Sequence, residues 1–157
     1  MRGLRFALFA LLLATGCIAP PPPAERAADA VRELNLAARF GRTELAGGLT
    51  ADSARKGFLQ RRASWGRDIR VVDVELAGFD MSAKDRVRVE VDYAWTRMDE
   101  GQLRTTRVAQ EWRDTGRGFK LVSEHRSGGD VGLFGEPAPA SDPVKRRDVQ
   151  FATKVIQ

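Results

Sequence analysis

The sequence predicts an α+β domain in which N-terminal helices pack on a curved, four-stranded antiparallel sheet. Residues 24–64 place apolar side chains at helical spacing, whereas residues 69–126 alternate apolar and polar side chains with a period of two. The segments of the second region are joined by short turns, which suit antiparallel pairing of consecutive strands. We therefore expect two helices followed by a meander of four strands.

The first helix is expected over residues 24–40, with Gly41 as its end. Its apolar stripe consists of Ala27, Ala30, Val31, Leu34, Ala37 and Ala38. A second helix is expected from an N-cap at Thr50 to about Ser64, with Gly66 as its stop. This helix is expected to bury Ala54, Phe58, Leu59 and Ala63.

Four strands are expected after the helices. Residues 69–77 are apolar at nearly every position, which predicts a strand covered on both faces for part of its length. In the second strand, one face carries Val87, Val89, Val91, Tyr93 and Trp95. The third, residues 103–113, places Thr106, Val108, Gln110 and Trp112 on one face, and the fourth alternates from Phe119 onward. Turns are expected at residues 99–101 and 114–118, and Ser127-Gly128-Gly129-Asp130 is expected to break the sheet.

The first residues have the anatomy of a secretory signal peptide. Arg2 and Arg5 precede an uninterrupted apolar run over residues 6–13, and small side chains follow at residues 14–16. A membrane-spanning helix needs about 20 apolar residues, and this run is far shorter before the prolines at residues 20–23. We expect residues 1–16 to be removed as a targeting segment.

The stretch LATGC at residues 13–17 resembles the lipobox of bacterial lipoproteins, although Ala14 stands where that family most often has leucine. The resemblance implies cleavage between Gly16 and Cys17 and a lipid on the Cys17 sulfur, which would also account for the single cysteine of the chain. Because Ile18 rather than aspartate follows the cysteine, the family pattern favours an outer-membrane lipoprotein whose domain faces the periplasm. The alternative is an ordinary secretory signal peptide whose cleavage site includes a cysteine.

The remaining chain divides into a tether, a domain and a tail. Residues 17–23 hold the lipidated cysteine and a Pro-rich tether, and residues 24–130 form the α+β domain. Residues 131–157 comprise an apolar loop, a Pro-rich linker and a tail that ends with Val149, Phe151, Val155 and Ile156. Such an apolar ending is expected to dock, either on a sheet edge of its own domain or on a partner by strand addition.

The order of helices and strands, together with the hairpin VAQEWRDTGRGFKLV at residues 108–122, resembles the nuclear transport factor 2-like superfamily. That superfamily, which includes ketosteroid isomerases and SnoaL-like cyclases, has a cone-shaped α+β fold that encloses a pocket. A typical member has three helices, so residues 41–49 are left to supply the missing element. A cystatin-like sheet with a single helix is the nearest alternative.

The side chains that could line such a pocket are Tyr93, Trp95, Trp112 and His125. Strand parity from Phe119 and Leu121 places Ser123 and His125 on the inner face, although His125 at a solvated rim and the tryptophans as core are the simpler interpretations. One histidine and no thiol in the mature chain give no metal site, and no cofactor motif is present.

The composition favours a binding domain over an enzyme or a nucleic-acid-binding protein. Removing the signal leaves 24 basic residues against 21 acidic ones, a mild excess without a clustered basic face. The expected partners are the membrane, through Cys17, and an envelope protein, with no nucleic acid and no metal. We expect a non-catalytic domain that binds a protein partner or a small apolar ligand. The alternative is a small-molecule isomerase or hydrolase that uses His125 with a carboxylate in the cone pocket.

Overall fold

The computed structural model describes residues 20–137, and within them three helices precede four strands. The helices are α2 (Pro23–Arg39), α3 (Thr43–Gly48) and α4 (Asp52–Arg61), and the strands are β1 (Ile69–Ala83), β2 (Arg86–Arg97), β3 (Leu103–Asp114) and β4 (Phe119–Gly129). The signal segment, Cys17 and the tail from residue 138 lie outside the described residues. In the described part of the chain, no helix has the length and apolar character needed to cross a membrane.

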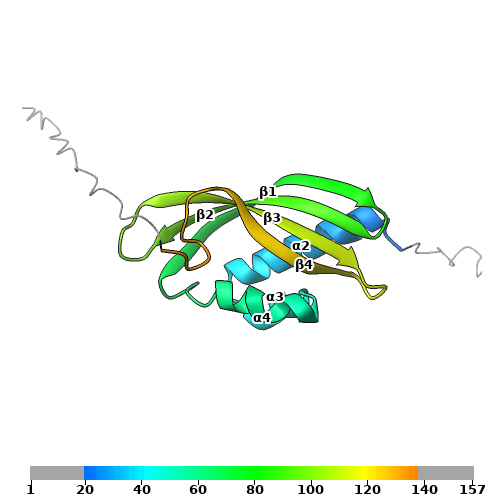
Figure 1. Cartoon of the computed structure of the whole chain (residues 1–157), viewed down its shortest axis with the longest axis horizontal. Coiled ribbons are helices and arrows are strands. Elements are labelled where there is room, and N and C mark those ends of the chain that lie inside the picture. The colour runs from blue at the N-terminus through cyan, green and yellow to red at the C-terminus, as the bar shows by residue number, and fades with distance from the viewer. Residues whose placement is uncertain (1–19, 138–157) are drawn as a thin grey trace, which may run out of the picture.

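The strands form one antiparallel sheet in the order β1-β2-β3-β4, so β1 and β4 are its edges. The sheet is curved, and α2 runs along its concave side while α3 and α4 lie below the β4 edge (Figure 1). The predicted α+β architecture of helices on a curved four-stranded antiparallel sheet is confirmed.

The long helix α2 forms as the apolar stripe predicts. Pro23 occupies the first turn, where its missing N–H costs no hydrogen bond, and Glu25 and Arg39 lie at the ends that suit their charges. The predicted stripe faces the sheet, and the polar Asn35 is buried with it.

The second helical region differs from the prediction. Residues 43–48 supply the short helix α3, and α4 is confined to Asp52–Arg61. Thr50 does not cap α4, because its hydroxyl donates to the carbonyl of Ala46 at 3.0 Å. The predicted burial of Leu59 and Ala63 was wrong, since both are exposed and Arg62 is buried in their place.

The two central strands follow the predicted alternation. The inner face of β2 is buried at Val87, Val89, Val91, Tyr93 and Trp95, and that of β3 at Thr106, Val108, Gln110 and Trp112. Each strand is flanked by two neighbours, so both ladders of backbone hydrogen bonds are filled and one face packs on the helices. The sheet centre is therefore the core of the domain.

The prediction that residues 69–77 are covered on both faces was wrong. β1 is an edge strand, and most of its residues are exposed or half-exposed. Its inner face carries Val74, Leu76 and Phe79 opposite Tyr93, Val91 and Val89, but α2 does not reach over all of it. The apolar run thus reflects an edge that extends beyond the helix rather than a doubly covered strand.

Strand β4 contains an irregularity that determines which of its side chains face the interior. The pairs Trp112–Leu121 and Glu111–Ser123 leave Val122 as an extra residue, a β-bulge that reverses the facing of the side chains after it, up to a second register shift at Ser127. Glu124 consequently points inward, whereas Ser123 and His125, which strand parity allowed to point inward, are exposed, so the simpler interpretation of a solvated His125 is confirmed.

The break expected at residues 127–130 also falls later, because β4 continues to Gly129. Gly129 has φ of +76°, and a Cβ on it would lie 2.3 Å from the carbonyl oxygen of Thr105. Only glycine fits this close approach, after which the chain turns into the loop that carries Leu133 into the core.

Val91→Ala is expected to lower the free energy of unfolding by about 1–3 kcal/mol, because a buried side chain at the sheet centre loses two methyl groups and leaves a cavity. The matched control is Val72→Ala on the exposed edge, for which a change within about 0.5 kcal/mol is expected. Urea unfolding measures both, and equal losses at the two positions would contradict the assigned core.

Candidate functional site

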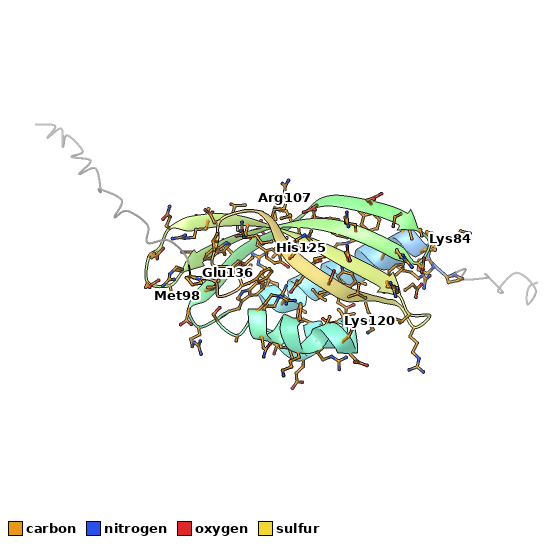
Figure 2. All side chains as sticks on the ribbon, in the orientation of Figure 1. Lys84, Met98, Arg107, Lys120, His125 and Glu136 are labelled. Atoms are coloured by element: carbon orange, nitrogen blue, oxygen red, sulfur yellow. The ribbon has the colours of Figure 1, made fainter. Side chains whose placement is uncertain are left out.

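The residues proposed for a pocket do not gather around one. Tyr93, Trp95 and Trp112 are at most 1% exposed and fill the interior as core side chains. His125 is exposed on the outer face of the sheet near Glu111, on the opposite face from its neighbour Glu124 (Figure 2). The structure therefore does not bring His125 and a carboxylate together inside a closed pocket.

The interior instead holds an ion pair between α4 and β4. Both amino groups of the Arg62 guanidinium donate to the Glu124 carboxylate, one of them at 2.8 Å to Oε2. Arg61 adds two hydrogen bonds to Glu124 Oε1, at 3.2 Å from Nε and 3.1 Å from Nη2. The side chain of Glu124 is 0% exposed and that of Arg62 is 2% exposed, whereas Arg61 reaches solvent. One buried carboxylate thus contacts two guanidinium groups, and the excess positive charge lies on the Arg61 side, which reaches solvent.

The charges of this cluster stay fixed near neutral pH. Burial by itself raises the pKa of Glu124, but the guanidinium groups of Arg62 and Arg61 outweigh burial and hold that pKa below its ordinary value. Burial likewise opposes the charged form of Arg62, and the contact with Glu124 outweighs it, so the pKa of Arg62 rises. A carboxyl with a lowered pKa is a weak general base.

Aromatic rings enclose the Arg62 guanidinium. Its central carbon lies 3.8 Å from the centroid of Phe58, 4.8 Å from that of Trp65 and 5.4 Å from that of Phe134. The Trp65 indole also donates to the carbonyl of Leu133 at 2.8 Å, which fixes the loop after β4. This loop closes the interior above the ion pair.

A second polar network lies between α2 and the sheet. The Tyr93 hydroxyl donates to Asn35 Oδ1, and Asn35 and Gln110 exchange hydrogen bonds of 2.9 Å and 3.1 Å. Trp112 Nε1 donates to Gln110 Oε1 at 3.3 Å. Burial raises the pKa of Tyr93 to about 12 against the opposing effect of Arg62. These groups satisfy one another, so the interior that could hold a ligand is occupied by side chains.

The open apolar surface lies outside the cone, between α2 and β1. Two hollows of about 630 Å³ and 230 Å³ follow this line, the first at the end of α2 and the second beside its middle. We call them together the α2–β1 groove, defined by Leu36, Phe40, Val72 and Leu76. Phe40 is 66% exposed, and the other three are between 41% and 45% exposed. Four large exposed apolar side chains thus line the two hollows between α2 and β1.

The groove exists because the sheet is wider than the helix that covers it. α2 lies along the inner face of the sheet and approaches β1, to which Arg39 is joined by an ion pair with Asp73 at 2.9 Å and by a hydrogen bond to the carbonyl of Val72. Leu76 is therefore on the inner face but only half covered. In the sequence, the apolar run of residues 69–77 indicated this surface, but the run was interpreted as a strand covered on both faces.

Comparison with solved structures places this fold among NTF2-like proteins. An NTF2-like protein from Cytophaga hutchinsonii superposes with a TM-score of 0.52 at 16% identity, covering 64% of this chain and 93% of that one. The intermembrane space region of the chloroplast protein ARC6 superposes with a TM-score of 0.50 at 16% identity, covering 68% of this chain and 98% of that one. No family model and no curated protein matches the sequence. The predicted NTF2-like fold is confirmed.

Glu124→Ala is expected to lower the free energy of unfolding by about 3–5 kcal/mol, because it leaves the buried Arg62 charge uncompensated. The combined change Arg62→Met with Glu124→Leu is the control, since it removes both charges and fills the same space. Chemical denaturation should find the double variant more stable than Glu124→Ala. A double variant as unstable as the single one would contradict the ion-pair assignment.

The ion pair also predicts a dependence of stability on pH. Because the folded pKa of Glu124 lies below its ordinary value of 4.5, its contribution is fully present above that value and is lost as the pH falls through the folded pKa. Unfolding free energies measured from neutral pH down to about pH 3 should therefore fall more steeply for the wild type than for the Arg62→Met, Glu124→Leu double variant. Parallel curves would show that Glu124 does not carry this dependence.

Proposed function

We propose that this chain is a non-catalytic binding domain that holds a segment of a partner protein in the α2–β1 groove. The observation that carries the proposal is the contrast between an interior filled by side chains and a groove that exposes apolar side chains. The interior is filled by mutually bonded side chains, while the groove leaves Phe40 66% exposed beside three other large apolar residues. Apolar surface that is this exposed on one side of a small domain is typical of an interaction site.

The shape of the groove favours a polypeptide over a small ligand. Sites for small molecules bury most of the ligand surface in a concave cavity. The groove is open along the β1 edge, and its apolar residues lie along the strand and the helix rather than around a closed chamber. An extended or helical segment with apolar side chains at intervals can contact Leu36 and Phe40 together while one side stays in solvent.

The alternative, an isomerase or hydrolase that works through the cone pocket, has less support. Its proposed base, His125, is on the outer face, and the inward carboxylate, Glu124, is neutralised by two arginines. Tyr93, with a pKa raised to about 12, gives up its proton reluctantly near neutral pH.

We also propose that the domain is anchored by a lipid on Cys17, cleaved after Gly16, to the outer membrane with the domain in the periplasm. The sequence pattern of residues 13–17 is the support for this proposal. Pro20, Pro21 and Pro22 are exposed and lead directly into α2, which is compatible with a stiff tether outside the domain. An anchored domain would present the groove to proteins of the same compartment.

A photoreactive benzoylphenylalanine placed at Phe40 is expected to capture a partner protein when the full chain is irradiated in the cell envelope, because this side chain lies in the groove and is exposed. The matched control is the same substitution at Met98, which is 61% exposed but lies outside the groove. Leu36→Asp in the Phe40-labelled chain should remove the captured band. Equal capture from both positions, or none from Phe40, would contradict the groove as the binding site.

Cys17→Ser is expected to abolish labelling by a palmitate analogue and cleavage before residue 17, because transfer of the lipid needs the thiol. The wild-type protein should fractionate with the outer membrane and resist extraction by high salt, since salt screens charge contacts but not a hydrophobic anchor. Ile18→Asp should move the protein toward the inner membrane. An unlabelled wild-type protein in the soluble fraction would overturn the anchoring proposal.

A further inference from the structure

We infer that the α2–β1 groove is occupied by the chain's own C-terminal segment, residues 144–157, when no partner is bound. The inference rests on the proposed function, because it concerns the same groove. It adds the segment that fills the groove when no partner is bound. It rests on the place where the described chain ends, on the reach of the linker, and on the composition of the segment.

The chain leaves the domain beside the groove. Trp65 lines the larger hollow and also donates its indole N–H to Leu133, four residues before the last described residue, Pro137. The loop is held there by Glu136, whose carboxylate accepts hydrogen bonds from the backbone of Gly132 at 3.2 Å and of Phe134 at 2.9 Å. The tail therefore starts at the end of the domain where the groove begins.

The tail has the length to follow the groove. Seven peptide steps separate Pro137 from Val144, and they can span at most about 25 Å. A segment on so short a connection experiences its own domain at an effective concentration on the order of millimolar. A contact with a dissociation constant of about 1 mM would thus be roughly half occupied within one molecule. Only a modest apolar contact is required.

The composition of the tail matches this surface. Val149, Phe151, Val155 and Ile156 supply large apolar side chains, the kind that the groove leaves uncovered. Residues 144–157 carry four basic side chains and one acidic one, and the charged side chains that line the groove are Arg32, Arg39 and Arg70. Charge therefore does not attract the tail to the groove, and the contact is expected to depend on apolar side chains.

The contact is expected to be made by side chains rather than by adding a strand to β1. Three register shifts interrupt the pairing of β1 with β2, after Val71, Leu76 and Asp80, and bulges of this kind discourage a further strand. The Arg39 guanidinium also donates to the carbonyl oxygen of Val72. On this inference, Phe151 is expected to contact Phe40 and Leu36, which are exposed in the groove.

The test uses the purified full chain, without any partner, carrying benzoylphenylalanine at Phe40 in one preparation and at Met98 in another. Met98 is equally exposed and lies at the same end of the molecule as Glu136, so a tail that is merely tethered would reach both positions (Figure 2). After irradiation and digestion, mass spectrometry should find cross-links from Phe40 into residues 144–157, on the order of fivefold more than from Met98.

Tail variants test whether the apolar side chains cause the capture. Phe151→Asp with Val155→Asp should reduce cross-linking from Phe40 to the level of Met98. The control, Gln150→Asp with Thr153→Asp, adds the same charge at polar positions and should retain most of the capture. Neither pair changes a residue of the described domain, so loss of folding is not an explanation for loss of capture.

Several results would overturn the inference. Equal capture from Phe40 and Met98, or capture unaffected by the Phe151 and Val155 changes, would show that the tail does not occupy the groove. Cross-links to the tail of another molecule, identified by mixing isotopically light and heavy chains, would replace the intrachain contact with one between copies. Because this experiment contains no partner, its outcome is independent of whether envelope capture from Phe40 succeeds.

Discussion

The ion pair between Arg62 and Glu124 is the interaction on which the arrangement of the domain depends. It joins the end of α4 to the second half of β4, and Arg61 adds a second contact to the Glu124 carboxylate from the solvent side. An unpaired charge at either position would be costly in so buried a place, so the helix end and the strand must be aligned. Phe58, Trp65 and Phe134 then pack around the guanidinium, which brings the loop after β4 over the interior.

A filled interior moves any binding function to the surface. Tyr93, Asn35, Gln110 and Trp112 satisfy one another's polar groups at the centre of the cone, and the sheet face opposite the helices is covered by charged pairs such as Arg88–Glu111 and Arg107–Asp92. Among the described residues, a stretch of exposed apolar surface lies between α2 and β1, at Leu36, Phe40, Val72 and Leu76. The same fold can hold a ligand inside or a partner outside, and here the side chains favour the outside.

Much of the fold could be predicted because period and turn chemistry are local properties. The stripe of α2, the inner faces of β2 and β3 and both glycine-containing turns follow from residues a few positions apart. The errors were of another kind. Leu59 and Ala63 are apolar and at helical spacing, so burial was expected for them. Arg62 is buried instead, because its guanidinium pairs with the buried Glu124. Gln110 and Thr106, polar residues on an apolar face, were the available signal of a polar interior.

The sequence by itself determined the order of the elements, the inner faces of the central strands and the pattern at Cys17, because each depends on residues that are close together in the chain. Tertiary structure alone decided that β1 is an edge, that Val122 is a bulge and that Glu124 rather than His125 faces inward. The extra residue Val122 reverses the side to which Glu124 and His125 point, and the alternation of residues before it gives no sign of the shift. Coverage of a strand likewise depends on how far a helix extends across the sheet, which is a relation between distant segments.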